Sequence, residues 1–198
     1  IGSGLVGSEM CIRDREYDVT MPYIRMMAGP VDYTPGAMRN ASKKDFKDIY
    51  YNPMSQGTRC HQLAAYVVHD SPLTMLADNP TIYKREQECT DFIISIPNKG
   101  IEETRVLQGK VGESIIMARR AGTSWYIGGM TDWTAREITL DFDFLDNGNY
   151  EVILFKDGIN ADKQAEDYKQ EQFTITPASK KKIRMASGGG FAMTITKK

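Results

Sequence analysis

The run Glu137-Ile138-Thr139-Leu140-Asp141-Phe142-Asp143-Phe144 decides the fold of the second half of the chain, because its apolar and polar residues alternate without interruption. Strict alternation is typical of a β-strand that has one face in a core and the other in water. Asn147-Gly148 follows and favours a tight turn into the apolar residues 150–155. We therefore predict that these two runs form a β-hairpin.

Five more short runs with the composition of strands surround this segment. Turn residues such as Gly122, Gly158 and Pro177 separate them, and the runs themselves are residues 111–119, 125–130, 173–176, 183–186 and 191–196. Several short strands at this spacing predict an antiparallel β-sandwich, which we assign to residues 101–198.

The first half of the chain has helical periodicity instead. Apolar residues at helical spacing predict helices over residues 18–27, 60–68 and 79–96, with Pro22 in the first turn of the first helix and Asn79-Pro80 at the start of the third. The short apolar runs 31–34 and 73–77 between them are typical of buried parallel strands. Because such strands need neighbours on both sides, residues 16–100 are predicted to be the last two βα units of a (β/α)8 barrel.

Residues 1–15 have a different character. The run Leu5-Val6-Gly7-Ser8-Glu9-Met10-Cys11-Ile12-Arg13-Asp14 resembles a translated sequencing adapter, and its charged residues interrupt the apolar stretch that a signal peptide needs. We predict that residues 1–15 are adapter-derived and disordered. With most of the barrel missing, incomplete burial is expected for the apolar residues Leu63, Val67, Leu73, Met75, Phe92 and Ile93.

Composition excludes several classes of function. Lys and Arg total 25 against 26 Asp and Glu, so we expect neither nucleic acid nor a membrane as a partner. No apolar run approaches the ~18 residues of a membrane span. Cys60 and Cys89 are expected to be buried thiols, and His61 and His69, eight residues apart on one helix, lack further ligands for zinc. The oligomeric state stays open.

Candidate site residues follow the two predicted parallel strands. Asp32 and Tyr33 end the first strand, and Asp78 and Asn79 end the second. In a barrel the carboxyl ends of the strands form the active site, where two carboxylates could act as general acid and base. The alternative is that Asp78 and Asn79 cap the next helix and that Asp32 bonds to its own turn.

Two further groupings each have a structural alternative. An oxygen-rich loop could bind calcium, but its spacing is not that of an EF-hand, and a solvated turn is favoured for Asp157, Asn160 and Asp162. An aromatic group could stack on sugars, although packing in the sandwich core is the commoner explanation for Trp125, Tyr126 and Trp133.

Five strings give the chain a resemblance to glycoside hydrolase family 97. They are Met27-Ala28-Gly29-Pro30-Val31-Asp32-Tyr33-Thr34-Pro35-Gly36-Ala37-Met38, Ser55-Gln56-Gly57-Thr58-Arg59-Cys60, Ser71-Pro72-Leu73-Thr74-Met75-Leu76, Gly128-Gly129-Met130-Thr131-Asp132-Trp133 and Leu154-Phe155-Lys156-Asp157-Gly158-Ile159-Asn160-Ala161-Asp162. The resemblance implies an exo-acting, periplasmic enzyme that removes terminal α-linked glucose or galactose from oligosaccharides. It also implies an N-terminal β-sandwich, a calcium-dependent barrel and a C-terminal β-sandwich.

The resemblance places the catalytic and calcium-binding glutamates upstream of Asp18. No catalytic residue or metal ligand can therefore be assigned in this chain, which we expect to be inactive alone. Four residues are expected to shape the substrate pocket, namely Asp32, Tyr33, Met38 and Arg39, whereas Asp78 becomes structural. The alternative is that the β-sandwich is a non-catalytic module with a carbohydrate-binding or structural role.

Overall fold

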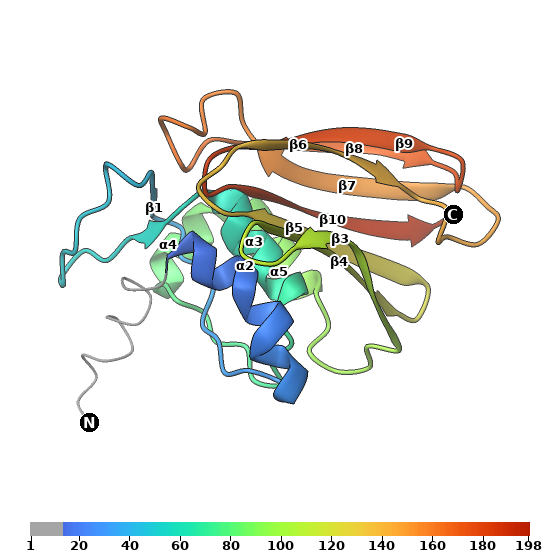
Figure 1. Cartoon of the computed structure of the whole chain (residues 1–198), viewed down its shortest axis with the longest axis horizontal. Helices are drawn as coiled ribbons and strands as arrows, with labels where there is room; N and C mark the ends of the chain where they lie inside the picture. The colour runs from blue at the N-terminus through green and yellow to red at the C-terminus, as the bar shows by residue number, and fades with distance from the viewer. Residues whose placement is uncertain (1–13) are drawn as a thin grey trace.

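The structure is a computed structural model that describes residues 14–198 (Figure 1). The predictions made for residues 1–13 therefore lie outside the described residues. Within them, helices cover one face of a large β-sheet and a second, smaller sheet covers the other face.

The large sheet has six strands, all paired antiparallel, in the order β3-β4-β5-β10-β7-β8. The strands are β3 (Glu103–Lys110), β4 (Ser114–Ala121), β5 (Ser124–Thr131), β7 (Tyr150–Asp157), β8 (Tyr168–Ile175) and β10 (Gly190–Lys197). The small sheet pairs β6 (Arg136–Asp141) with β9 (Lys180–Met185). Fully buried side chains such as Leu140, Phe142 and Phe191 fill the space between the two sheets. The predicted antiparallel β domain is thus present.

The predicted hairpin between residues 137–144 and 150–155 is wrong. Both runs form strands, but β6 pairs with β9 in the small sheet while β7 pairs with β8 and β10 in the large one. The turn at Asn147-Gly148 therefore carries the chain from one sheet to the other. Alternation fixes which face of a strand is buried, but it does not choose the partner strand.

Among residues 14–198, five helical segments precede the β domain. They are α2 (Arg15–Ile24), the 3₁₀ turn η1 (Met26–Ala28), α3 (Arg59–Val68), α4 (Pro80–Arg85) and α5 (Gln87–Ser95). The single helix expected over residues 79–96 is broken at Glu86, whose φ and ψ of −101° and 51° are not helical. Asn79 caps α4 as predicted, because its side chain accepts from the backbone N–H groups of Thr81 and Ile82.

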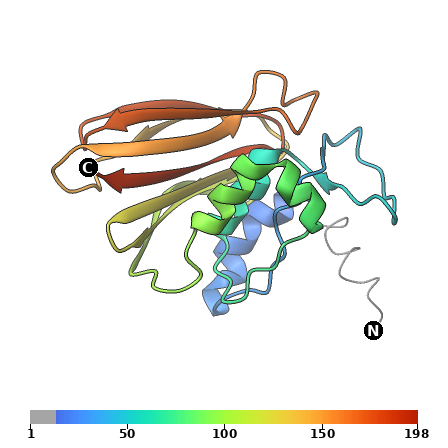
Figure 2. The same ribbon diagram turned by 180° about the vertical axis from the view of Figure 1, so that it is seen from behind.

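The helices and the β domain share one core. Helix α3 lies directly on β5 and β10, and Leu63 and Val67 are fully buried in the same cluster as Phe155 and Ala192 (Figures 1 and 2). The expectation of incomplete burial is therefore wrong for Leu63, Val67, Phe92 and Ile93, because the strands cover them. It is confirmed for Leu73 and Met75, which are 67% and 39% exposed.

Pro22 lies near the end of α2 and not in its first turn, because the helix begins at Arg15. A proline has no N–H, so the carbonyl oxygen of Asp18, four residues earlier, receives no bond from it. His69 lies 3.3 Å away with its Nε2 and occupies that carbonyl. The carbonyl that Pro22 leaves without a helical hydrogen bond is therefore paired with the His69 side chain, at the C-terminal end of α3.

Parallel pairing is present but short. The two-residue strands β1 (Asn40–Ala41) and β2 (Ser55–Gln56) pair in parallel, and Tyr33 forms a single parallel bridge with Thr74. The predicted runs 31–34 and 73–77 form no longer ladder among residues 14–198. The structure thus has the strand direction expected of a barrel, but the described residues do not form the barrel itself.

Candidate functional site

The segment from Val31 to Asn40 carries the candidate pocket residues, and side chains from two helices, α3 and α4, hold it. The hydroxyl of Tyr66 on α3 donates to the carbonyl of Pro35 at 2.9 Å, and that of Tyr83 on α4 donates to the carbonyl of Gly36 at 2.8 Å. The N–H of Gly36 donates to Gln62 at 3.0 Å. Backbone polar groups in this segment are thereby paired although the segment has almost no regular structure.

The backbone conformation and the close packing at position 36 both require a glycine. Its φ of 91° lies in the left-handed region, and a Cβ at this position would collide with the Tyr66 hydroxyl. The turn at Gly36 therefore sets the direction in which the chain continues to Met38 and Arg39.

Only part of the candidate set reaches the surface. Asp32 is exposed and Arg39 is half-buried, whereas Tyr33 is buried and Met38 is completely inaccessible. Met38 packs into the core shared with Phe155. Direct contact with a ligand is therefore open to Asp32 and Arg39, while Tyr33 and Met38 act on the segment from inside.

Arg39 borders a hollow of about 300 Å³ between the first half and the β domain. Ser42 and Asp45 line it from the loop after β1, and Gln164 lines it from the loop between β7 and β8. Asp32 is not among the lining residues, so the structure does not bring Asp32 and Arg39 into one hollow.

Arg59 ties the Arg39 segment to the β domain. Its Nε donates to the side-chain oxygen of Asn40 at 2.7 Å, and its Nη2 donates to the carbonyl of Met38. Its backbone N–H donates to the carbonyl of Ala165 at 2.8 Å, and the N–H of Asn40 donates to Glu166 at 3.3 Å. The loop that contains Ala165 and Glu166 thus belongs to the β domain but supports the candidate pocket segment.

Asp78 has a structural contact. Its Oδ2 accepts from the N–H of Met38 at 2.6 Å, and its own N–H donates to the Tyr83 hydroxyl at 3.1 Å. Asn79, and not Asp78, caps the following helix. Asp32 and Asp78 therefore do not form an acid–base pair of like carboxylates, because Asp32 is exposed and Asp78 is bonded to the backbone.

A buried charged cluster joins α2 to α3, and sequence reasoning missed it. Asp18 is completely buried, and its Oδ2 forms an ion pair with Nη2 of Arg15 at 2.7 Å. His61 contacts Asp18 through Nε2 at 3.4 Å and the carbonyl of Gly189 through Nδ1 at 3.1 Å. The signal in the sequence is the pair of histidines eight residues apart in one helical stretch, whose pattern suggests at most a metal site and gives no indication of Asp18 as a partner.

The pKa values of this cluster follow from burial and charge. Burial alone would raise the pKa of Asp18, but the neighbouring Arg15 guanidinium and His61 lower it to about 2. Burial lowers the pKa of His69 to about 4, and burial together with Arg15 lowers that of His61. At neutral pH the cluster therefore holds one carboxylate, one guanidinium and two neutral imidazoles.

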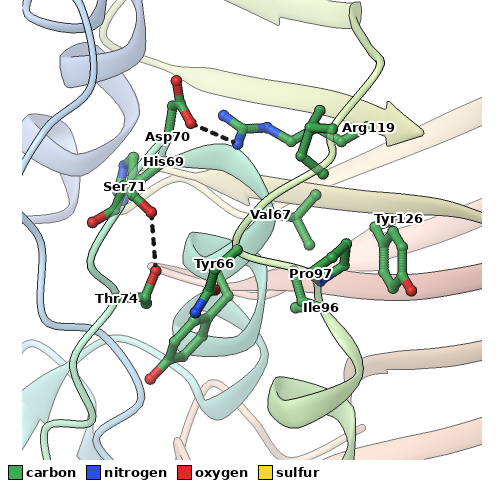
Figure 3. Close-up of a pocket in the computed structure, with 12 residues that line it drawn as sticks. Tyr66, Val67, His69, Asp70, Ser71, Thr74, Ile96, Pro97, Arg119 and Tyr126 are labelled. Atoms are coloured by element: carbon green, nitrogen blue, oxygen red, sulfur yellow. Dashed lines mark hydrogen bonds and ion pairs between the residues drawn. The ribbon is translucent and has the colours of Figure 1, made fainter. Parts of the chain in front are cut away.

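A small cavity lies beside this cluster (Figure 3). It measures about 20 Å³, and its lining includes His69, Tyr126 and the ion pair between Arg119 and Asp70, whose atoms are 3.3 Å apart. The close-up shows Arg119 reaching from its strand toward Asp70. A space of this size accommodates about one water molecule and no sugar ring.

The aromatic grouping proposed for sugar stacking is not one platform. Trp125 and Tyr126 are consecutive in β5, so their side chains lie on opposite faces of the sheet. Trp125 is buried and packs edge-to-face on Phe144 at 5.0 Å in the sandwich core. Trp133 lies elsewhere, with its Nε1 donating to Asp14.

The oxygen-rich loop is also occupied by structural contacts. Asp157 is buried and accepts from the N–H groups of Ala186 and Gly190 at 2.8 and 2.9 Å, and Asp162 pairs with Arg184. Within residues 14–198 there is no group of three or more His, Cys, Asp or Glu side chains that could hold a metal ion. Both Cys60 and Cys89 are free buried thiols, as predicted.

No helix among the described residues is long and apolar enough to cross a membrane.

Comparison with known proteins gives consistent matches. Residues 100–196 match the family model described as "Glycosyl-hydrolase 97 C-terminal, oligomerisation". A retaining alpha-galactosidase of Bacteroides thetaiotaomicron is 54% identical over 180 residues, which cover 91% of this chain and 27% of the relative. A probable retaining alpha-galactosidase of Streptomyces bingchenggensis is 27% identical over 155 residues, covering 78% of this chain and 22% of the relative. The chain thus spans about a quarter of the length of these curated relatives.

Solved structures agree with the sequence comparison. A glycoside hydrolase family 97 enzyme from Pseudoalteromonas sp. strain K8, in complex with acarbose, superposes with a TM-score of 0.81 and 32% identity. The match covers 94% of this chain and 29% of that enzyme. A variant of the same enzyme in complex with panose superposes equally well. A beta-arabinopyranosidase shares the fold, with a TM-score of 0.75 and 21% identity.

Proposed function

The chain belongs to glycoside hydrolase family 97, and from this premise we propose that it is the C-terminal part of an exo-acting enzyme that removes terminal α-linked galactose from oligosaccharides. The observation that carries the proposal is the 54% identity to a retaining alpha-galactosidase, which extends over both halves of the chain. α-Glucosides are the second candidate, because the solved relative was captured with acarbose and with panose.

Retention of configuration is part of the proposal, since both curated relatives are described as retaining. A retaining glycosidase uses two carboxyl groups about 5 Å apart, one as nucleophile and one as acid and then base. We place both groups, and the ligands of the expected calcium ion, in the part of the enzyme that precedes Asp18. This chain alone should then be inactive.

The role proposed for this chain is to bind the sugar substrate and to orient it. Asp32 and Arg39 are the two candidate pocket residues whose side chains reach solvent, and the Arg59 contacts fix the backbone on which Arg39 stands. A fixed backbone holds the side chain of Arg39 in one orientation toward a bound sugar. Correct orientation of the sugar lowers the entropic part of the activation barrier. Tyr33 and Met38 are assigned to holding the segment from the core.

Assays of the complete enzyme and of this chain test the proposal together. The intact enzyme should release nitrophenol from nitrophenyl α-galactoside faster than from nitrophenyl α-glucoside, and proton NMR should detect the α-anomer of galactose as the first product. The 198-residue chain should release none. Hydrolysis by this chain at an enzyme-like rate, or an intact enzyme inactive on both α-glycosides, would refute the assignment.

Three further features are proposals with their own tests. A periplasmic location would be checked by fractionation of cells that express the intact enzyme, and calcium dependence by loss of activity with a chelator. Oligomerisation, which the family description names, would be checked by light scattering. The rival idea of a purely non-catalytic module is not favoured, because the matched relatives are described as enzymes and the match includes the helices.

A further inference from the structure

A groove of about 320 Å³ runs between α5 and the helix-facing side of the large sheet. The helices cover only part of that side, and Figure 2 shows β7 and β10, drawn in orange and red, extending beyond the green helix α5. The groove shares no lining residue with the hollow at Arg39. It is therefore separate from the candidate pocket segment.

Aromatic rings form the base of the groove. Phe92 of α5 and Phe155 of β7 pack with their ring centroids 5.2 Å apart. Tyr126 of β5 flanks them half-exposed, and its hydroxyl donates to the carbonyl of Ser95 at 2.9 Å. That bond fixes the ring orientation, and a fixed amphipathic ring is suited to packing against the carbon-bound face of a sugar.

Neutral polar groups stand beside these rings because of the strand register. Thr194 of β10 pairs with Tyr126 and with Ile153, and Gln170 of β8 pairs with Phe155. Ile153 and Phe155 are two residues apart on β7, so all five side chains lie on one face. Among the described residues, neither the Gln170 amide nor the Thr194 hydroxyl has a side-chain hydrogen bond. Both groups can donate and accept, which is what sugar hydroxyls require.

The charged side chains that line the groove are acidic, which disfavours the binding of an anionic ligand. Glu88 and Asp91 line it from α5, and none of its lining residues is a Lys or an Arg. Glu88 accepts from Tyr168 at 2.9 Å and Asp91 from Gln87 at 2.6 Å, and each carboxylate keeps further acceptor capacity. A phosphate, sulfate or uronic acid would be repelled here, whereas a neutral polyol would not.

We propose that this groove is a sugar-binding site, which holds one neutral hexose unit of an oligosaccharide and shares no lining residue with the hollow at Arg39. A groove of this volume is at the lower end of the range for small-ligand sites, and it combines an apolar base with a few polar groups. The inference goes beyond the proposed hydrolase activity, and binding to this chain tests it without any turnover.

Calorimetric titration of the 198-residue chain with methyl α-galactoside and methyl α-glucoside is the direct experiment. Saturable binding is expected, with the dissociation constant raised about fivefold or more by Gln170→Ala and by Thr194→Val, since each removes one hydrogen bond worth about 1 kcal/mol. The matched control is Gln172→Ala, on the same strand and face but outside the groove, where Gln172 bonds to Glu151. It should leave binding unchanged.

Circular dichroism would confirm that the surface variants remain folded. Three results would overturn the proposal. The first is the absence of any heat of binding when the concentration of either glycoside is raised well above about 1 mM. The second is an equal loss with Gln172→Ala. The third is a dimer in light scattering that Gln170→Arg converts to monomer, which would assign the groove to a second copy of the chain. None of these results bears on hydrolysis by the intact enzyme, so the two proposals fail independently.

Discussion

The Nε of Arg59 lies 2.7 Å from the side-chain oxygen of Asn40, and this contact joins the helix that packs on the β-sheet to the segment that carries Arg39. The same guanidinium donates to Glu86 at 2.9 Å, at the break between α4 and α5. Arg59 is 1% exposed, so none of these bonds is replaced readily by water.

Arg59→Met should lower the free energy of unfolding by about 3 kcal/mol, because it leaves buried acceptors on Asn40 and Met38 without a donor. Urea denaturation would measure the change. Arg85→Met is the matched control, since Arg85 is an exposed partner of the same Glu86 and its removal should change stability by less than about 0.5 kcal/mol. Equal losses in the two variants would show that Arg59 contributes only a surface ion pair.

Gly36→Ala should destabilise the chain by more than about 2 kcal/mol, because the new methyl group adds a collision with Tyr66 to the strain of a left-handed backbone. The comparison is Gly122→Ala, where φ is 57° but nothing lies within 4 Å, and which should lose only about 1 kcal/mol. Thermal melts of both variants give the difference. If the two lose the same amount, the close approach to Tyr66 is not limiting.

Stability should fall as the pH is lowered from about 6.5 to about 4, because His69 binds a proton in the unfolded chain before it does so in the folded one. Asp18 extends the loss from about 4 down to about 2, since its folded pKa is depressed. Asp157 acts in the opposite direction, because burial raises its pKa to about 6. His69→Gln should therefore flatten the dependence of the melting temperature on pH between 6.5 and 4 relative to the parent chain. An unchanged slope would mean that His69 is already protonated in the fold.

Asp32→Asn and Arg39→Ala in the intact enzyme should each lower kcat/KM for an aryl α-galactoside by about tenfold, which corresponds to the loss of one hydrogen bond to a charged group. Asp143→Asn, at an exposed turn beyond β6, is the control and should have no effect. Wild-type kinetics in both pocket variants would remove these residues from the binding role and leave them as parts of a packing segment.

The sequence predicted individual elements better than their partners. Alternation at Ile138, Leu140 and Phe142 correctly indicated a strand with one buried face, but pairing with β9 depends on residues some forty positions away. The edge strand β3 was not predicted, because six of its eight residues are exposed and its sequence therefore lacks an apolar–polar alternation. Helix α3 was predicted because its apolar spacing is strong, and Asn79-Pro80 because its capping chemistry is local.

The candidate site shows the same division. Asp32 and Tyr33 could be named from their position at the end of a predicted strand, whereas Arg39 was indicated only by the family resemblance. The cluster of Arg15, Asp18 and His61 could not, because it forms only when α2 and α3 pack side by side. Burial of Met38 was equally hidden, since its neighbours in the core come from the β domain.

The sharing of one core by α3 and the strands has a practical consequence for protein engineering. Exchanging β domains between relatives at residue 100, where the chain passes from helices to strands, would leave Leu63 and Val67 against a foreign surface. A chimaera should instead be joined upstream of α2, so that the helices and the sheet on which they pack come from the same parent protein.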